Sequence, residues 1–143
     1  MIEYRQSGRP PTEEAIALYR AKTLAERRPV DDSERMDRML RSANVLIAVY
    51  DEDRLVGLSR AMSDFGWVCY VADLLVDQKW QGQGIGRELL RLTHEVAGGE
   101  DGITLILVAA PEAMSYYPKI GFEPIPEGWR RQRGRNRGSV LQP

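Results

Sequence analysis

The feature of this sequence that most limits its fold is an apolar stretch that runs into a cluster of glycines and then into a stretch with helical periodicity. Residues 67–76 are mostly apolar and predict a strand, and glycines follow at positions 82, 84 and 86. Residues 87–97 have one apolar side at helical spacing, formed by Leu89, Leu90, Leu92, Thr93 and Val96. A strand, a tight turn and an amphipathic helix in this order predict a sheet with a helix packed on its face.

Two further strands are predicted directly before this one. Residues 44–50 and 54–62 are rich in Val, Leu and Ile, and the polar segments 51–53 and 63–66 separate the three strands. Because short polar turns join neighbouring strands in opposite directions, the three strands are expected to form an antiparallel meander.

Helices and a short strand are predicted before the meander. Residues 2–6 predict an opening strand. One helix is expected with Thr12 as its N-cap and acidic residues in its first turn. A second helix is expected from Asp32 or Ser33 to about Arg41, with an apolar side that packs inward.

The last third of the chain predicts smaller elements. Residues 103–108 form a continuous apolar run, which is typical of a strand buried on both faces. A short helix is expected over residues 111–119 with Gly121 as its C-cap, followed by weak strands at 122–125 and 129–131. We therefore expect one α/β (α+β) domain over residues 1–143, with a mixed, mostly antiparallel sheet flanked by helices.

The composition excludes several classes of site. The 143 residues include one cysteine, Cys69, and one histidine, His94, so neither an internal disulfide nor a multi-histidine metal site can form, and no metal is expected. The sequence contains no apolar run long enough to span a membrane and no apolar signal core near its N-terminus. The expectation is a cytoplasmic protein with no membrane partner.

The charges are unevenly distributed, although the net charge is only -1. The last 14 residues contain five arginines and no acid, so residues 1–129 have a net charge of -6. An acidic body favours cations or amines as ligands and argues against nucleic acid. The basic tail from about residue 130 is interpreted as a solvated terminus, with RNA binding or a final edge strand as the alternatives.

The glycine cluster predicts a site for a phosphate or pyrophosphate group. Glycines allow successive main-chain N–H groups to turn toward one point, and the N-terminus of the following helix adds partial positive charge. The spacing fits neither the P-loop G-x-x-x-x-G-K-[ST] nor the dinucleotide motif G-x-G-x-x-G, because position 89 is leucine. A purely structural strand-to-helix turn is the alternative.

Two motifs resemble those of the GNAT superfamily of N-acetyltransferases. Residues 81–86 match its acyl-CoA pyrophosphate motif Q/R-x-x-G-x-G/A, and residues 117–122 are similar to its Y-x-K-x-G-F segment. The resemblance extends over nearly the whole chain, as far as Ile125. Residues 60–64 and 121–128 are also similar to plastid-type aralkylamine (serotonin) acetyltransferases and their small bacterial relatives.

This resemblance implies acetyl-CoA as the acyl donor and a sheet that splays apart at its site. The pantetheine arm would run beside Leu74, Leu75 and Val76, and an N–H near Leu75 or Val76 would face the thioester oxygen. Many family members have Asn seven residues before the motif tyrosine; here that position is Ala110. The pyrophosphate would be held by Gln81, Gly82, Gln83, Gly84, Ile85, Gly86 and Arg87.

The resemblance also suggests which groups move protons. Tyr117 matches the tyrosine that protonates the departing thiolate and would lie near the cofactor, with Tyr116 as the fallback and a core aromatic role as the alternative. For the base, the candidates are Asp73, which lies in an apolar run where an unpaired carboxylate is costly, then Asp64, and water. Asp64 is favoured as a turn residue, His94 as a structural or solvent-facing residue and Cys69 as a packing residue.

The expected function is transfer of an acetyl group from acetyl-CoA to a primary amine of a small molecule, by direct attack in a ternary complex. The alternative is a non-catalytic module of the same fold that binds acyl-CoA as a sensor or regulator. The sequence does not specify the acceptor, and a homodimer stays open.

Overall fold

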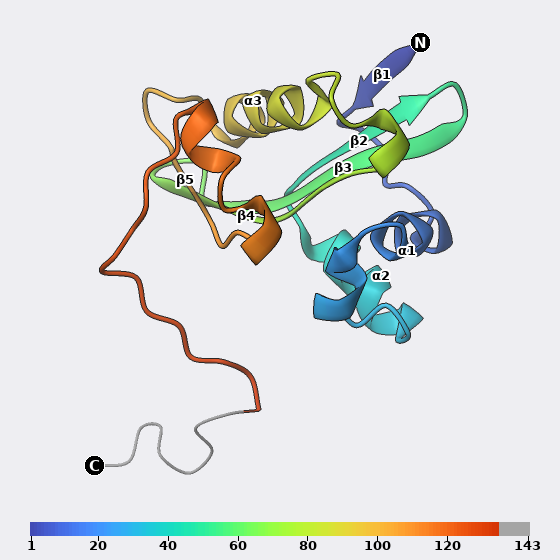
Figure 1. The fold of residues 1–143 in the computed structure, drawn as a ribbon, viewed down its shortest axis with the longest axis horizontal. Helices are drawn as coiled ribbons and strands as arrows, with labels where there is room; N and C mark the ends of the chain where they lie inside the picture. Colours follow the sequence, from blue (N-terminus) through green and yellow to red (C-terminus); the bar gives the residue numbers. More distant parts are fainter. Residues whose placement is uncertain (135–143) are drawn as a thin grey trace. The chain divides into compact units, whose positions relative to one another are not determined.

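The computed structural model describes residues 1–134, and in this part of the chain five strands form one sheet in the order β1-β2-β3-β4-β5 (Figure 1). Neighbours from β1 to β4 are antiparallel, whereas β4 and β5 are parallel, which confirms a mixed and mostly antiparallel sheet. The strands are β1 (Ile2–Arg5), β2 (Val45–Asp51), β3 (Arg54–Ser63), β4 (Val68–Val76) and β5 (Thr104–Leu107). The molecule divides into two compact units, Met1–Pro111, which holds the sheet, and Glu112–Pro143.

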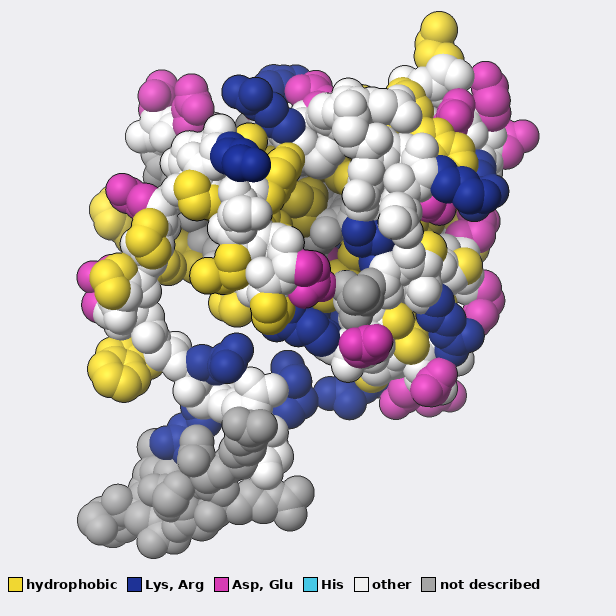
Figure 2. Space-filling model, in the orientation of Figure 1, with side chains coloured by type: hydrophobic (Ala, Val, Ile, Leu, Met, Phe, Trp, Pro, Cys, Tyr) yellow, Lys and Arg dark blue, Asp and Glu magenta, His cyan; other side chains and the backbone are white. Residues whose placement is uncertain are grey.

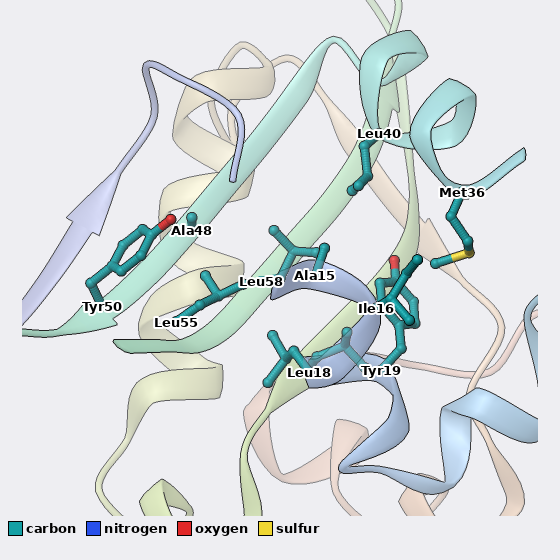
Figure 3. Close-up of a cluster of buried hydrophobic side chains, with 11 residues drawn as sticks. Ala15, Ile16, Leu18, Tyr19, Met36, Leu40, Ala48, Tyr50, Leu55 and Leu58 are labelled. Atoms are coloured by element: carbon teal, nitrogen blue, oxygen red, sulfur yellow. The ribbon is translucent and has the colours of Figure 1, made fainter. Parts of the chain in front are cut away.

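Helices cover the two faces of the sheet in the first unit. Helices α1 (Thr12–Arg20) and α2 (Ser33–Ser42) lie on one face, and α3 (Ile85–Ala97) lies on the other (Figure 1). Side chains of α1 and α2 point toward the strands and form the larger apolar core, which includes Tyr19, Leu40 and Leu58 (Figure 3). The smaller core packs Ile85 and Leu89 of α3 against the opposite face of β2 and β3.

The sequence predicted the start of α2 correctly but not the N-cap of α1. Helix α2 begins at Ser33, within the predicted start, and Asp32 caps it by accepting a hydrogen bond from the main-chain N–H of Arg35. The expected cap of α1 is wrong, because Pro11 occupies the N-cap position and no side chain caps this helix. The hydroxyl of Thr12 instead donates a hydrogen bond to Asp37 of α2 at 2.8 Å, so Thr12 joins two helices.

Strand β4 contains one residue more than its partner β3 at the middle of their ladder. Arg60 pairs with Asp73, and the next residue of β3, Ala61, pairs with Val71, so Ala72 is an inserted bulge residue. Because a bulge reverses the alternation of side chains, residues 69 and 71 face the α3 side, whereas Asp73 and Leu75 face the α1 side.

Strand β5 differs from the prediction of a strand buried on both faces. It is the last strand of the sheet, and its residues are half-buried or exposed. Its pairing with β4 begins at Val68 and Thr104 and ends at Val71 and Leu107. Beyond that point, residues 73–76 of β4 pair with β3 alone, so the sheet parts between β4 and β5 in the described chain.

The continuous helix expected over residues 111–119 is wrong, because this segment forms two short 3₁₀ helices with a turn between them. The two 3₁₀ helices are η3 (Pro111–Ala113) and η4 (Tyr117–Ile120). Gly121 ends η4 in the left-handed conformation, as predicted for the C-cap. Pro118 interrupts a longer helix because it lacks an N–H donor. The weak strands predicted at 122–125 and 129–131 are absent from the described residues, and Pro124 is unsuited to a strand ladder.

Charged side chains of both signs cover the parts of the surface that α1, α2 and the β2–β3 hairpin form in the view of Figure 2. The acidic excess of the first 129 residues is therefore mixed with arginines there rather than gathered in one patch. Among the described residues, no helix has the length and apolar character needed to cross a membrane. Two arginines of the basic tail, Arg135 and Arg137, lie outside the described residues.

Candidate functional site

The glycine cluster forms an exposed turn between β4 and α3. Gly82 and Gly84 have φ angles of +83° and +82°, which side-chain-bearing residues rarely adopt. Gly84 is the N-cap of α3, and the first hydrogen bond of this helix is donated by the N–H of Glu88 to its carbonyl. The N–H groups of Ile85, Gly86 and Arg87 come before this first bond of the helix ladder, so they form a donor set at a helix N-terminus.

A short 3₁₀ helix, η2 (Gln78–Trp80), fixes the approach to this turn. Asp77 caps η2 by accepting from the N–H of Lys79 at 3.0 Å. The indole N–H of Trp80 donates to Asp51 at 2.9 Å, and the guanidinium of Arg54 lies 5.0 Å from the Trp80 ring centroid. The β2–β3 hairpin therefore holds the segment that leads into the glycine turn.

The predicted pantetheine strand is the second half of β4. Leu75 is buried in the core on the α1 side, whereas Leu74 and Val76 pack on the α3 side. This segment pairs with β3 on one edge, and β5 ends its pairing before it. Its other edge can accept an extended ligand by strand addition, a common mode of recognition.

Asp73 lies at the centre of a buried polar cluster. Its side chain has no exposed surface, and its carboxylate accepts a hydrogen bond from the hydroxyl of Tyr19 on α1. Nε of Arg60 lies 2.6 Å from Oδ2, and Nε of Arg28 lies 2.7 Å from Oδ1. Both carboxylate oxygens therefore accept hydrogen bonds from cationic groups.

Burial and the carboxylate fix the protonation of the neighbouring groups. Burial, followed by the charge of Asp73, raises the pKa of the Tyr19 phenol far above its usual range, so Tyr19 stays a donor. Burial opposes the charge on Arg60, yet Asp73 outweighs it and raises the pKa of that guanidinium. The structure thus supplies the partners that the apolar setting of Asp73 required. A role for Asp73 as a base stays a prediction.

Asp64, His94 and Cys69 have structural surroundings in the first unit. Asp64 accepts from the N–H groups of residues 66, 67 and 68 at 2.9, 2.7 and 3.0 Å, and these bonds lower its pKa. Nε2 of His94 lies 2.6 Å from the carbonyl oxygen of Ile103, a structural contact between α3 and the residue before β5. Cys69 is a buried free thiol whose pKa is raised by burial.

Tyr117 belongs to the second unit, whereas the other predicted site residues belong to the first. It begins η4, and its ring packs edge-to-face with Tyr116 at 5.3 Å and Phe122 at 5.4 Å between centroids. Burial raises the pKa of the Tyr117 phenol, so the hydroxyl is protonated at neutral pH. Its role as a general acid stays a prediction.

Sequence reasoning missed three residues of the polar cluster: Tyr19, Arg28 and Arg60. Arg60 gave a usable signal, because a charged residue in an apolar strand needs a partner, just as Asp73 does. Tyr19 and Arg28 lie 54 and 45 residues from Asp73 in the sequence, and neither stands in a motif.

A mixed sheet that parts between two parallel strands, with a glycine turn and a helix N-terminus beside the parting, is the arrangement expected from the resemblance to GNAT acetyltransferases. Residues 11–135 match the family model described as an acetyltransferase (GNAT) domain. The chain belongs to the GNAT family of acetyltransferases.

Known proteins of this family resemble the chain in sequence or in structure. The histone acetyltransferase TAP1 of Glycine max is 35% identical over 78 residues, which cover 54% of this chain and 34% of that protein. The chain thus spans about a third of the length of this curated relative. A Staphylococcus aureus protein of unknown function has a TM-score of 0.75 at 25% identity, with 92% of this chain and 99% of that one covered.

A third comparison shows the fold with a ligand. The aminoglycoside N-acetyltransferase AAC(6')-Iy in complex with CoA has a TM-score of 0.70 at 15% identity. The likeness covers 93% of this chain and 95% of that one. At this identity the likeness concerns the fold alone.

Proposed function

We propose that this chain transfers the acetyl group of acetyl-CoA to a primary amine of a small molecule, by direct attack in a ternary complex. The observation that supports this most is that one continuous segment contains both an unpaired strand edge and a set of exposed N–H groups. The half of β4 that has an unpaired edge leads, within a few residues, into the exposed N–H groups of the glycine turn. An extended thiol arm that ends in a pyrophosphate fits this order.

The residues present fit acetyl-CoA in the way that the sequence motif implies. Residues 81–87 would hold the pyrophosphate, since the N–H groups of Ile85, Gly86 and Arg87 stand at a helix N-terminus and Arg87 adds a positive charge in the first turn. Leu74, Leu75 and Val76 would pair with the pantetheine arm. When bound, acetyl-CoA supplies an acetyl group activated as a thioester.

The proposed proton transfers are assigned to this chain and to water. A main-chain N–H near Leu75 or Val76 would donate to the thioester oxygen as negative charge develops. Tyr117, a protonated phenol, would donate its proton to the departing thiolate. We favour water for deprotonation of the amine, because Asp73 already accepts from two guanidinium groups and Asp64 from three main-chain N–H groups.

Two observations support a small cationic amine as the acceptor. The first 129 residues are acidic, which suits a cationic amine. Two structures of the same fold are aminoglycoside acetyltransferases, one in complex with sisomicin. A protein acceptor is the competing reading, because one relative is named a histone acetyltransferase.

Titration calorimetry with acetyl-CoA, followed by assays of free thiol release, tests this function. The acceptors are a panel of aryl- and alkylamines, an aminoglycoside and a lysine-containing histone tail peptide. Thiol release that depends on a small amine supports the proposal, and release with the peptide alone replaces it with a protein acceptor. Binding without release from any acceptor supports the sensor, and an absence of binding overturns the donor assignment.

A further inference from the structure

Arg28 connects the segment between α1 and α2 to the bulge of β4. Its Nη2 donates to the carbonyl oxygen of Ala72 at 2.8 Å, and its Nε lies 2.7 Å from Oδ1 of Asp73. We propose that Arg28 is a positioning residue for acetyl transfer, which fixes the wall of the acceptor site against the strand that holds the thioester. This inference rests on the proposed function and goes beyond the motif residues.

The location of Arg28 follows from the two faces of the sheet. The glycine turn leads into α3 and so supplies the donor from the face that α3 covers. An acceptor that attacks through the parting between β4 and β5 must then approach from the opposite face. That face holds α1, α2 and the 3₁₀ helix η1 (Thr23–Arg27), which Arg28 directly follows.

The contacts of Arg28 are those that a rigid fork makes. One guanidinium binds the main-chain carbonyl of Ala72 and the side chain of the next residue, Asp73, and its Nη1 donates to the carbonyl oxygen of Arg27 at 2.8 Å. One planar group therefore joins the segment between α1 and α2 to the bulge of β4. A lysine ammonium is a point charge that cannot reproduce this geometry.

Replacement of Arg28 is expected to shift the segment before α2 more than it lowers the stability of the fold. Asp73 keeps its bonds to Arg60 and Tyr19 when Arg28 is replaced, so the buried carboxylate is not left without a partner. Arg28 itself is partly solvated, with 21% of its side chain exposed. A freed segment before α2 would shift the bound amine relative to the thioester, and a displacement of about 1 Å can cost on the order of 100-fold in rate.

The test compares Arg28→Met, Arg28→Lys and the matched control Arg27→Met, since Arg27 is the exposed neighbouring arginine. Each variant is measured for acetyl-CoA Kd by calorimetry, for amine KM and kcat by thiol release, and for melting temperature. We expect Arg28→Met to raise the amine KM and lower kcat by roughly 10- to 100-fold in kcat/KM, with the acetyl-CoA Kd unchanged. Arg28→Lys should recover part of the loss, and Arg27→Met should match the wild type.

Two results would overturn this role while the proposed function stands. One is an active wild type whose Arg28→Met variant keeps the wild-type KM and kcat. The other is a variant in which the acetyl-CoA Kd rises in proportion to the loss of activity, which indicates general damage to the fold. A wild type that releases no thiol with any acceptor overturns the proposed function, and the role of Arg28 with it.

Discussion

Arg60 and Asp73 occupy directly paired positions of β3 and β4, and Nε of Arg60 lies 2.6 Å from Oδ2 of Asp73. Both side chains are largely removed from solvent, with 11% and 0% exposed. The pair explains how an apolar strand accommodates a carboxylate, because the charge of Asp73 is compensated by the strand beside it and by Arg28.

Replacement of Asp73 by Asn should therefore destabilise the fold strongly. Asn keeps the size of the side chain but leaves two guanidinium groups without their buried counter-ion, a change that costs about 3–5 kcal/mol in unfolding free energy. Urea unfolding followed by circular dichroism measures it, with Asp53→Asn in the exposed β2–β3 turn as the control. A loss no larger than that of the control would contradict this account of the cluster.

The Tyr19 phenol should make the protein sensitive to alkaline pH. Its pKa is raised in the folded state, so folded and unfolded chains are both protonated below about pH 10, and the stabilisation is complete there. Above that pH the unfolded chain loses the proton and the folded chain keeps it, so stability falls by about 1.4 kcal/mol per pH unit for this group. Tyr19→Phe should flatten this decline.

Urea unfolding at pH 8 and pH 11 measures this effect, and Tyr70→Phe, which removes an exposed phenol, is the control. Tyr19→Phe also removes a hydrogen bond to Asp73, so its stability at pH 8 should be lower than that of the wild type. An unchanged difference between pH 8 and pH 11 would show that Tyr19 is not the group that titrates.

The left-handed conformation of Gly84 should matter for both stability and binding. No heavy atom lies within 4 Å of a Cβ placed there, so the cost of Gly84→Ala comes from its φ of +82° and amounts to about 1–2 kcal/mol. Relief of this strain would turn the N–H groups at the start of α3, so acetyl-CoA should bind more weakly. Gly102→Ala, at an open position with ordinary φ, is the control in unfolding and calorimetry. Equal acetyl-CoA affinity in both variants would argue against the pyrophosphate site.

Tyr117→Phe separates the chemical step from donor binding. Loss of the hydroxyl should lower kcat by roughly 10²- to 10⁴-fold, as for other general acids, and leave the acetyl-CoA Kd largely unchanged. The ring contact with Phe122 needs no hydroxyl, so the local packing should survive. Tyr116→Phe is measured in parallel, and a larger loss in that variant would assign the proton to Tyr116 instead.

The sequence predicted the strands of the meander and the site segment well because their signals are local. The start of α2, the polar turns of the meander and the glycine turn before α3 each depend on residues within one short window. Thr12 shows the opposite case, because its hydroxyl binds Asp37, which lies 25 residues away, instead of capping its own helix. A local cap signal does not reveal such a competing tertiary partner.

The polar cluster and the edge of the sheet depend on contacts between distant segments. Periodicity does not tell which strand lies last in a sheet, so the apolar run at β5 predicted more burial than an edge strand has. The same holds for Asp73, whose need for a partner was visible although Tyr19 and Arg28 were not identified. Pairing order and side-chain partners are set by tertiary structure.

The extra residue at Ala72 has a consequence for how sequences of this kind can change length. Deletion of this one residue would restore strict alternation along β4 and would leave Asp73 opposite Arg60 on the α1 face, because Val71 before it faces α3. Leu75 would likewise keep its place in the core on the α1 side. A single deletion at this point should therefore be tolerated better than a deletion farther along β4, which would turn buried residues outward, and an alignment with a sequence that lacks the bulge assigns inward and outward residues correctly only when its gap falls at Ala72.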